Sequence, residues 1–273
     1  GGDLNILNGE LALETELGGA NENVVDVTVN GGATLSGTDA GEISGEVTVE
    51  SGGTMSGGLK IERGVTVELG GTISGELVIA GDLQLEGTLE LDPDTITTAN
   101  TATLANRSTI EVTVSTTPVT GKLKLTNMMT PVSLGAGAVK VDFDTDWVAD
   151  VIDGILGPVT SYTIIDSNVE VGVGEMLTGG PAGDGIAFKW AIFDLALSYD
   201  DSLACTDAGL GNVCLTATLA PSVEDDAETG NQQEIARAFD QAYICAQNPT
   251  LPECQIDPGT ADDFNEVFVN FAV

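Results

Sequence analysis

The 273-residue sequence contains no histidine, and its first half has no aromatic side chain. The first aromatic residue is Phe143 and the first proline is Pro93. Without histidine, a Ser-His-Asp triad and the catalytic histidine of hexapeptide acyltransferases are both excluded. The Gly-x-Ser-x-Gly elbow of serine hydrolases is also absent. Because the first half has no aromatic side chain, its core must be built from small and branched aliphatic side chains.

Basic residues are scarce, with 8 lysines and arginines against 43 acids and a net charge of −35. Such a charge repels phosphate backbones, so nucleic acid and anionic membranes are disfavoured as partners. The acids are dispersed, which favours a solvated surface over one acidic binding face. No apolar run approaches the ~20 residues that cross a bilayer, so we expect no membrane insertion of this segment. The start Gly-Gly-Asp lacks a signal-peptide pattern, and we expect a mature or excised piece.

Four positions recur in one register between residues 24 and 92, with steps of 20 and then 18 residues. A repeat of this length is typical of one turn of a β-helix, in which equivalent strands pair in parallel. Val-Thr-Val begins at 27, 47 and 65, and this alternation indicates a strand with one buried face. The recurring residues are Val27, Val47 and Val65; Leu35, Met55 and Ile73; Ser36, Ser56 and Ser74; and Gly37, Gly57 and Gly75.

From residue 75 the repeat divides into hexads that begin at Gly75, Gly81 and Gly87. Three hexads make one triangular turn, and glycine suits the corners because it enters positive φ without steric cost. Leucine-rich and helical repeats need helix-forming segments that this stretch lacks. A sandwich of antiparallel hairpins is the alternative, but few Asn-Gly or Asp-Gly turns occur. We therefore expect an all-β chain with β-helix repeats over residues 1–142.

Composition changes at residue 143, since all aromatics and cysteines lie from this position onward. We interpret 143–220 as an aromatic-rich β unit that caps the repeats. It contains a predicted helix over 146–156 with Asp146 as N-cap, and a predicted hairpin of 188–199 with 213–219. Residues 221–273 are predicted to hold a polar linker, a short helix over 231–246 and an apolar terminal strand.

The four cysteines form two pairs at equal short spacing, Cys205 with Cys214 and Cys245 with Cys254. Zinc sites use tighter pairs, so two local disulfides and an oxidising compartment are the better interpretation. The last ten residues are apolar for a chain end. We expect this tail to dock on the protein itself or on a partner, and in a self-association variant it adds a strand to a neighbouring copy. The apolar residues of the tail are Phe264, Val267, Val269 and Phe271.

Several segments resemble, in order, the C-terminal passenger region of bacterial autotransporters, which are type V secreted surface proteins of the pertactin-like kind. Residues 71–92 look like the last β-helix turns of that family, and 161–166 like the segment that leads into its autochaperone unit. Residues 193–219 look like the closing hairpin, and 231–240 like the helix upstream of the translocating barrel. The resemblance implies a right-handed parallel β-helix at the cell surface and continuation into an outer-membrane barrel. The barrel is absent here, and the disulfides depart from the family pattern.

Calcium is the one metal that a motif suggests. Acids at 142, 144, 146, 150 and 153 follow the spacing of a calcium loop, with Asp142, Asp144 and Asp146 as the first candidates. Trp147 stands where that loop needs glycine, and the first two acids also fit the outer face of a strand. The three threonines Thr28, Thr48 and Thr66 are compatible with an outward ladder like that of ice-binding solenoids, or simply with strand propensity.

No catalytic or cofactor-binding residue emerges from the pattern, so we expect a non-enzymatic structural or adhesive protein. It would lie at the bacterial cell surface or outside the cell and contact other copies of itself or surface components, in a layer or filament. The alternative is a carbohydrate-active β-helix enzyme, a lyase or hydrolase, that pairs carboxylates with basic residues. The basic candidates, by residue type alone, are Lys60, Arg63, Lys122, Lys124 and Lys140.

Overall fold

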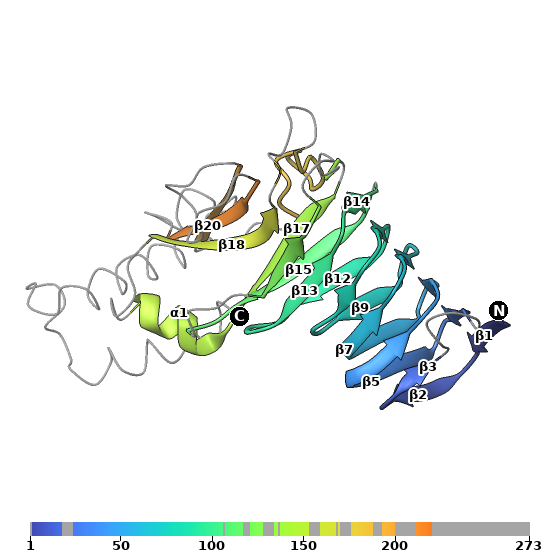
Figure 1. Ribbon diagram of the computed structural model, residues 1–273. Helices are drawn as coiled ribbons and strands as arrows, with labels where there is room; N and C mark the ends of the chain where they lie inside the picture. The colour runs from blue at the N-terminus through green and yellow to red at the C-terminus, as the bar shows by residue number, and fades with distance from the viewer. Residues whose placement is uncertain are drawn as a thin grey trace, which may run out of the picture.

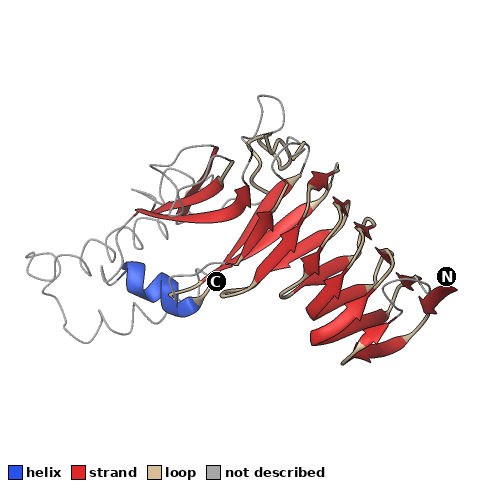
Figure 2. Cartoon of the chain, in the orientation of Figure 1, coloured by secondary structure: helices blue, strands red, loops and turns tan. Residues whose placement is uncertain are grey.

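The computed structural model describes a mostly β chain with long parallel sheets and one short helix (Figures 1 and 2). The described residues are 2–17, 24–105, 107–116, 121–127, 134–135, 137–152, 159–167, 169, 176–187, 193–199 and 211–219. The predicted linker, the helix over 231–246 and the terminal strand therefore lie outside the described residues.

The parallel strands fall into three runs, each of which takes one strand from every successive repeat. The first run is β1 (Gly2–Ile6), β4 (Val25–Val29), β6 (Val47–Val49), β8 (Val65–Val67), β11 (Leu83–Leu85) and β14 (Ala102–Leu104). The second run is β2 (Gly9–Leu13), the first parts of β5 (Ala33–Ile43) and β7 (Thr54–Ile61), β9 (Thr72–Ser74), β12 (Thr88–Leu91), β15 (Thr109–Val114) and β17 (Ala138–Phe143). The third run is β3 (Glu16–Leu17), the last parts of β5 and β7, β10 (Val78–Ile79), β13 (Ile96–Ala99), β16 (Lys122–Leu125) and β18 (Val159–Ser167).

The register of these strands confirms the predicted parallel pairing of the repeats. Val27 lies opposite Val47, and Val47 lies opposite Val65. These valines thus form one file, by which we mean a line of side chains at equivalent positions of successive strands. Leu35, Met55 and Ile73 form a second file. All six side chains are buried, and each gains roughly 1.5–3 kcal/mol from leaving water. The antiparallel alternative for this stretch is wrong.

Glycine files mark the bends between the second and third runs. Gly57 and Gly75 have φ of +87° and +90°, as expected for corners. A Cβ at Gly57 would lie 2.2 Å from the Gly37 carbonyl oxygen, so the stacked backbones also leave no room for a side chain. Gly81 and Gly87 do not have positive φ, so the prediction that glycine is needed there for a positive φ is wrong. A Cβ there would lie 2.6 Å from the Arg63 carbonyl carbon and 2.3 Å from the Gly71 carbonyl oxygen respectively, so close backbone approach demands glycine.

Beyond the repeats, aromatic side chains pack where β17, the helix and the hairpin meet. Helix α1 (Thr145–Ile152) follows β17, and the ring of Trp147 stacks on Phe143 at 4.7 Å between centroids. Phe193 lies 4.7 Å from Phe143 and 5.1 Å from Trp147. The Trp147 indole Nε1 donates to the Tyr162 hydroxyl over 2.7 Å, which satisfies a buried donor.

The predicted hairpin is confirmed, since β19 (Phe193–Tyr199) and β20 (Val213–Leu219) pair antiparallel. β20 also pairs with β18 and so joins the hairpin to the third run. The division of the chain at residues 142 and 220 stays a prediction.

Candidate functional site

Lys140 and three carboxylates form a charged cluster on the outer face of the second run. The strand register places Glu90 opposite Glu111 and Glu111 opposite Lys140. The Lys140 Nζ donates to Glu111 Oε1 over 2.6 Å and to Asp142 Oδ2 over 3.1 Å. The hydrogen bond to Glu111, followed by that to Asp142, raises the pKa of Lys140. This lysine therefore neutralises two carboxylates that the sheet holds close together.

Glu90 lies at the edge of this cluster, and no described basic side chain forms an ion pair with it. Partial burial raises the pKa of the Glu90 carboxyl, and the nearby charges of Glu111 and Asp92 raise it further. Stacked parallel strands are about 4.8 Å apart, so equal charges in one file repel each other strongly. A carboxyl with a raised pKa beside other carboxyl groups is one arrangement that general acids use. The cluster thus brings an amine and carboxyl groups, which are residue types used in acid–base catalysis, close together.

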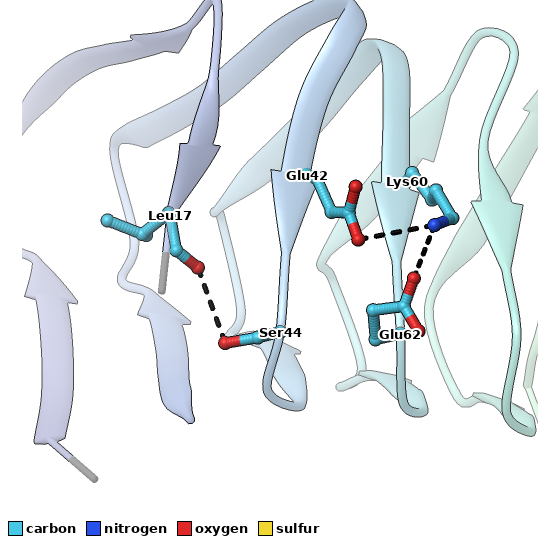
Figure 3. Close-up of polar contacts among 5 residues, drawn as sticks. All are labelled: Leu17, Glu42, Ser44, Lys60 and Glu62. Atoms are coloured by element: carbon cyan, nitrogen blue, oxygen red, sulfur yellow. Dashed lines mark hydrogen bonds and ion pairs between the residues drawn. The ribbon is translucent and has the colours of Figure 1, made fainter. Parts of the chain in front are cut away.

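A second cluster surrounds Lys60 on the outer face of the third run (Figure 3). The Lys60 Nζ donates to Glu42 Oε1 over 3.2 Å and also contacts Glu62. The hydrogen bonds to Glu62 and Glu42 raise the pKa of Lys60, and the bond from Lys60 lowers the pKa of Glu62. Two residues after Glu42, the buried Ser44 hydroxyl donates to the Leu17 carbonyl oxygen over 3.4 Å and holds neighbouring repeats together.

The five predicted basic candidates are not brought into one site. Lys60, Lys122 and Lys124 lie on strands of the third run, and Arg63 follows the strand that carries Lys60. Lys140 lies on the second run, in a different cluster. Sequence reasoning missed Glu90 because its role depends on register. The signal was present, since Thr88-Leu89-Glu90 and Thr109-Ile110-Glu111 share one pattern and are paired.

The acidic calcium candidates have other roles in the structure. Asp142 accepts from Lys140, and Asp144 accepts a hydrogen bond from the backbone N–H of Asp146 over 2.9 Å. The Asp144 carbonyl also accepts from the Val148 N–H, so Asp144 is the N-cap of α1 and the prediction of Asp146 is wrong. In the described part of the chain, no three Asp, Glu, Cys or His side chains are arranged to hold a metal ion.

Of the four cysteines, only Cys214 lies in the described part of the chain. It is fully buried in β20 and is not a free thiol. Cys205, Cys245 and Cys254 lie outside the described residues, so both predicted disulfides stay predictions. The tail residues predicted to mediate self-association lie outside them as well.

Threonine side chains form two outward files. Thr28, Thr48 and Thr66 lie opposite one another in the first run, as predicted. A longer file in the second run was not predicted. It consists of Thr34, Thr54, Thr72, Thr88 and Thr109.

Comparisons with family models, with curated proteins and with solved structures give no significant match to this chain. No helix within the described ranges is long and apolar enough to span a membrane.

Proposed function

We propose that the three runs belong to a right-handed parallel β-helix that ends in the aromatic-rich β unit. Consecutive strands of each run come from successive repeats, which supports one winding per repeat. The right-handed sense follows from the strong preference of parallel crossover connections.

The function that these residues favour is a structural or adhesive one, without catalysis, at the bacterial surface or outside the cell. The observation that carries this proposal is the regularity of the outer faces, where threonine side chains repeat from strand to strand and the carboxylates of Glu90 and Glu111 face each other. Lys60 and Lys140 are engaged as counter-ions to carboxylates on these faces. A regular, acidic rod keeps a large surface soluble and offers repeated contact points.

The cellular location rests on the ordered resemblance to autotransporter passengers and on the paired cysteines. Both are properties of the sequence, and both favour an exported protein. The partners that we propose are other copies of the chain, or components of the surface that carries it.

Electron microscopy of cells labelled with an antibody against residues 24–142 tests the location and the assembled form. We expect label outside the cell envelope, on a layer or on filaments. Label confined to the cell interior would contradict the proposal. Deletion of 264–273 then tests the tail as the link, and unchanged particle mass would exclude it.

A carbohydrate-active enzyme is the second candidate, and the raised pKa of Glu90 beside Glu111 and Lys140 favours it. Neutral and acidic polysaccharides are both to be tested as substrates, because Lys140 is already paired with Glu111 and Asp142 and does not by itself select for negative charge. Turnover that is lost in Glu90→Gln, but retained when an exposed acid between the remote strands β2 and β3 is changed in Glu14→Gln, would replace the structural proposal by this one.

A further inference from the structure

Two aliphatic side chains are exposed side by side on the third run. Val78 is 46% exposed and Ile96 is 37% exposed. Val78 lies opposite Thr98 of the next strand, and Ile96 is two residues before Thr98 on the same face. Such diagonal neighbours lie about 7–8 Å apart, within contact distance for aliphatic side chains that lean together.

Lysines flank this aliphatic pair on both sides. Lys60 lies opposite Val78 on one side, while Lys122 and Lys124 lie opposite Ile96 and Thr98 on the other. Three of the eight basic residues in the chain thus gather on four neighbouring strands. We call Lys60, Val78, Ile96, Thr98, Lys122 and Lys124 the β7–β16 patch.

We infer that the β7–β16 patch is where a second copy of this chain docks face to face. The inference rests on the proposed self-association. Two copies that each carry a net charge of −35 repel one another over most of their surfaces. Contact is favourable only where basic side chains offset this charge and apolar area is available for burial. The patch offers apolar area, and its lysines bring it close to neutrality, since Lys60 is paired with Glu42 and Glu62 and Lys124 lies opposite Asp166.

The register determines which side chains meet. A two-fold contact uses the same surface on both chains. When its axis runs along the strand direction and passes over Val78, the strands of the second copy follow one another in the reverse order. Val78 then meets Val78 of the second copy. Glu42 lies two strands to one side of Val78 and Lys124 two strands to the other. Each Lys124 therefore faces Glu42 of the second copy, and two symmetric ion pairs flank the aliphatic centre.

The contact is small. It spans five strands about 4.8 Å apart, which makes it roughly 20 Å long, and it covers about three residues along a strand, or roughly 10 Å. Its area is therefore well below the ~800 Å² per partner of a stable interface. The dimer is accordingly weak and forms where copies are crowded, as they are in a surface layer.

Sedimentation equilibrium of the full chain in physiological salt, from ten micromolar to one millimolar, tests the patch. We expect a monomer–dimer equilibrium in the wild type. Val78→Glu weakens association at least about tenfold, because it places an unpaired charge at the centre of the contact. Leu69→Glu is the control, since Leu69 is 47% exposed and lies outside the patch. A wild type that stays monomeric, or a Val78→Glu variant that associates like Leu69→Glu, would overturn the inference.

A charge exchange tests the predicted ion pairs. Glu42→Lys and Lys124→Glu each weaken association severalfold, and the double variant Glu42→Lys/Lys124→Glu recovers it. Additive losses in the double variant would overturn the proposed orientation. If copies still assemble on cells although Val78→Glu has no effect in solution, the patch is wrong while the surface-assembly proposal stands.

Discussion

Glu90 and Glu111 lie directly opposite each other in neighbouring parallel strands, on the same outer face of the sheet. Parallel stacking repeats the same face every ~4.8 Å, so a residue type that recurs in the sequence meets its own copy in space. For aliphatic side chains this is favourable and fills the core. For carboxylates it is unfavourable, unless a lysine such as Lys140 takes the next place in the file.

Replacing Glu90 by glutamine is expected to stabilise the protein at neutral pH. The pKa of Glu90 is raised in the folded state, so the folded state holds this proton more tightly than the unfolded state. Ionisation of Glu90 therefore costs stability as the pH rises from below its unfolded pKa through its folded pKa. We expect Glu90→Gln to gain about 0.2–1 kcal/mol at pH 7 and nothing below about pH 4, measured by urea unfolding. A gain of equal size at both pH values would contradict the repulsion.

Replacing Lys140 by glutamine is expected to destabilise the protein, because Glu111 and Asp142 lose their shared counter-ion. The cluster is partly exposed, so the loss is about 0.5–1 kcal/mol and shrinks at high salt. The pKa of Lys140 is raised by folding, so its contribution is complete below the unfolded pKa and is lost as pH rises through the folded value. Adding Glu90→Gln should recover part of the loss. Strict additivity of the two substitutions would show that they do not interact.

Gly57 and Gly9 form a matched pair for the corner geometry. Both have positive φ, but a Cβ at Gly57 meets the Gly37 carbonyl oxygen while a Cβ at Gly9 meets nothing within 4 Å. We expect Gly9→Ala to cost about 1–2 kcal/mol from backbone conformation alone. Gly57→Ala should cost clearly more, above about 3 kcal/mol, or prevent folding. Equal effects in thermal unfolding would mean that the repeats are not stacked this closely.

Removing the Tyr162 hydroxyl should expose the dependence of the aromatic cluster on one hydrogen bond. In Tyr162→Phe the indole N–H of Trp147, which is 1% exposed, loses its partner. We expect a loss of about 1–3 kcal/mol in the free energy of unfolding. In a Trp147→Phe background the same change should cost much less. If Tyr162→Phe lowered the free energy of unfolding equally in that background, the hydrogen bond to Trp147 would not be the cause of the loss.

The sequence predicted the repeating half well because its signals are local and periodic. Val27, Val47 and Val65 share a register that any parallel stacking must preserve, and the structure pairs them. The N-cap of α1 was misplaced by two residues because Asp144 and Asp146 are equally good caps by type. Only the hydrogen bonds distinguish them.

The charged clusters were less accessible to sequence reasoning. Lys140 and Glu111 are 29 residues apart in the chain, a separation that departs from the regular repeat. The intervening residues include β16 and the connections on either side of it, and the lengths of such connections are not encoded in strand periodicity. Lys60 and Glu42 are 18 residues apart, which is a regular repeat step, so their contact could have been predicted from the sequence.

Distances between spin labels along the first run test the stacked arrangement most directly. One label replaces Thr28, and the second is placed in turn at Thr66, Gln84 or Thr103, with singly labelled chains as the background control. For stacked parallel strands we expect backbone separations that rise by about 4.8 Å per strand, to about 10, 14 and 19 Å. Distances that do not increase in this order, as in a set of antiparallel hairpins, would contradict the stacked arrangement.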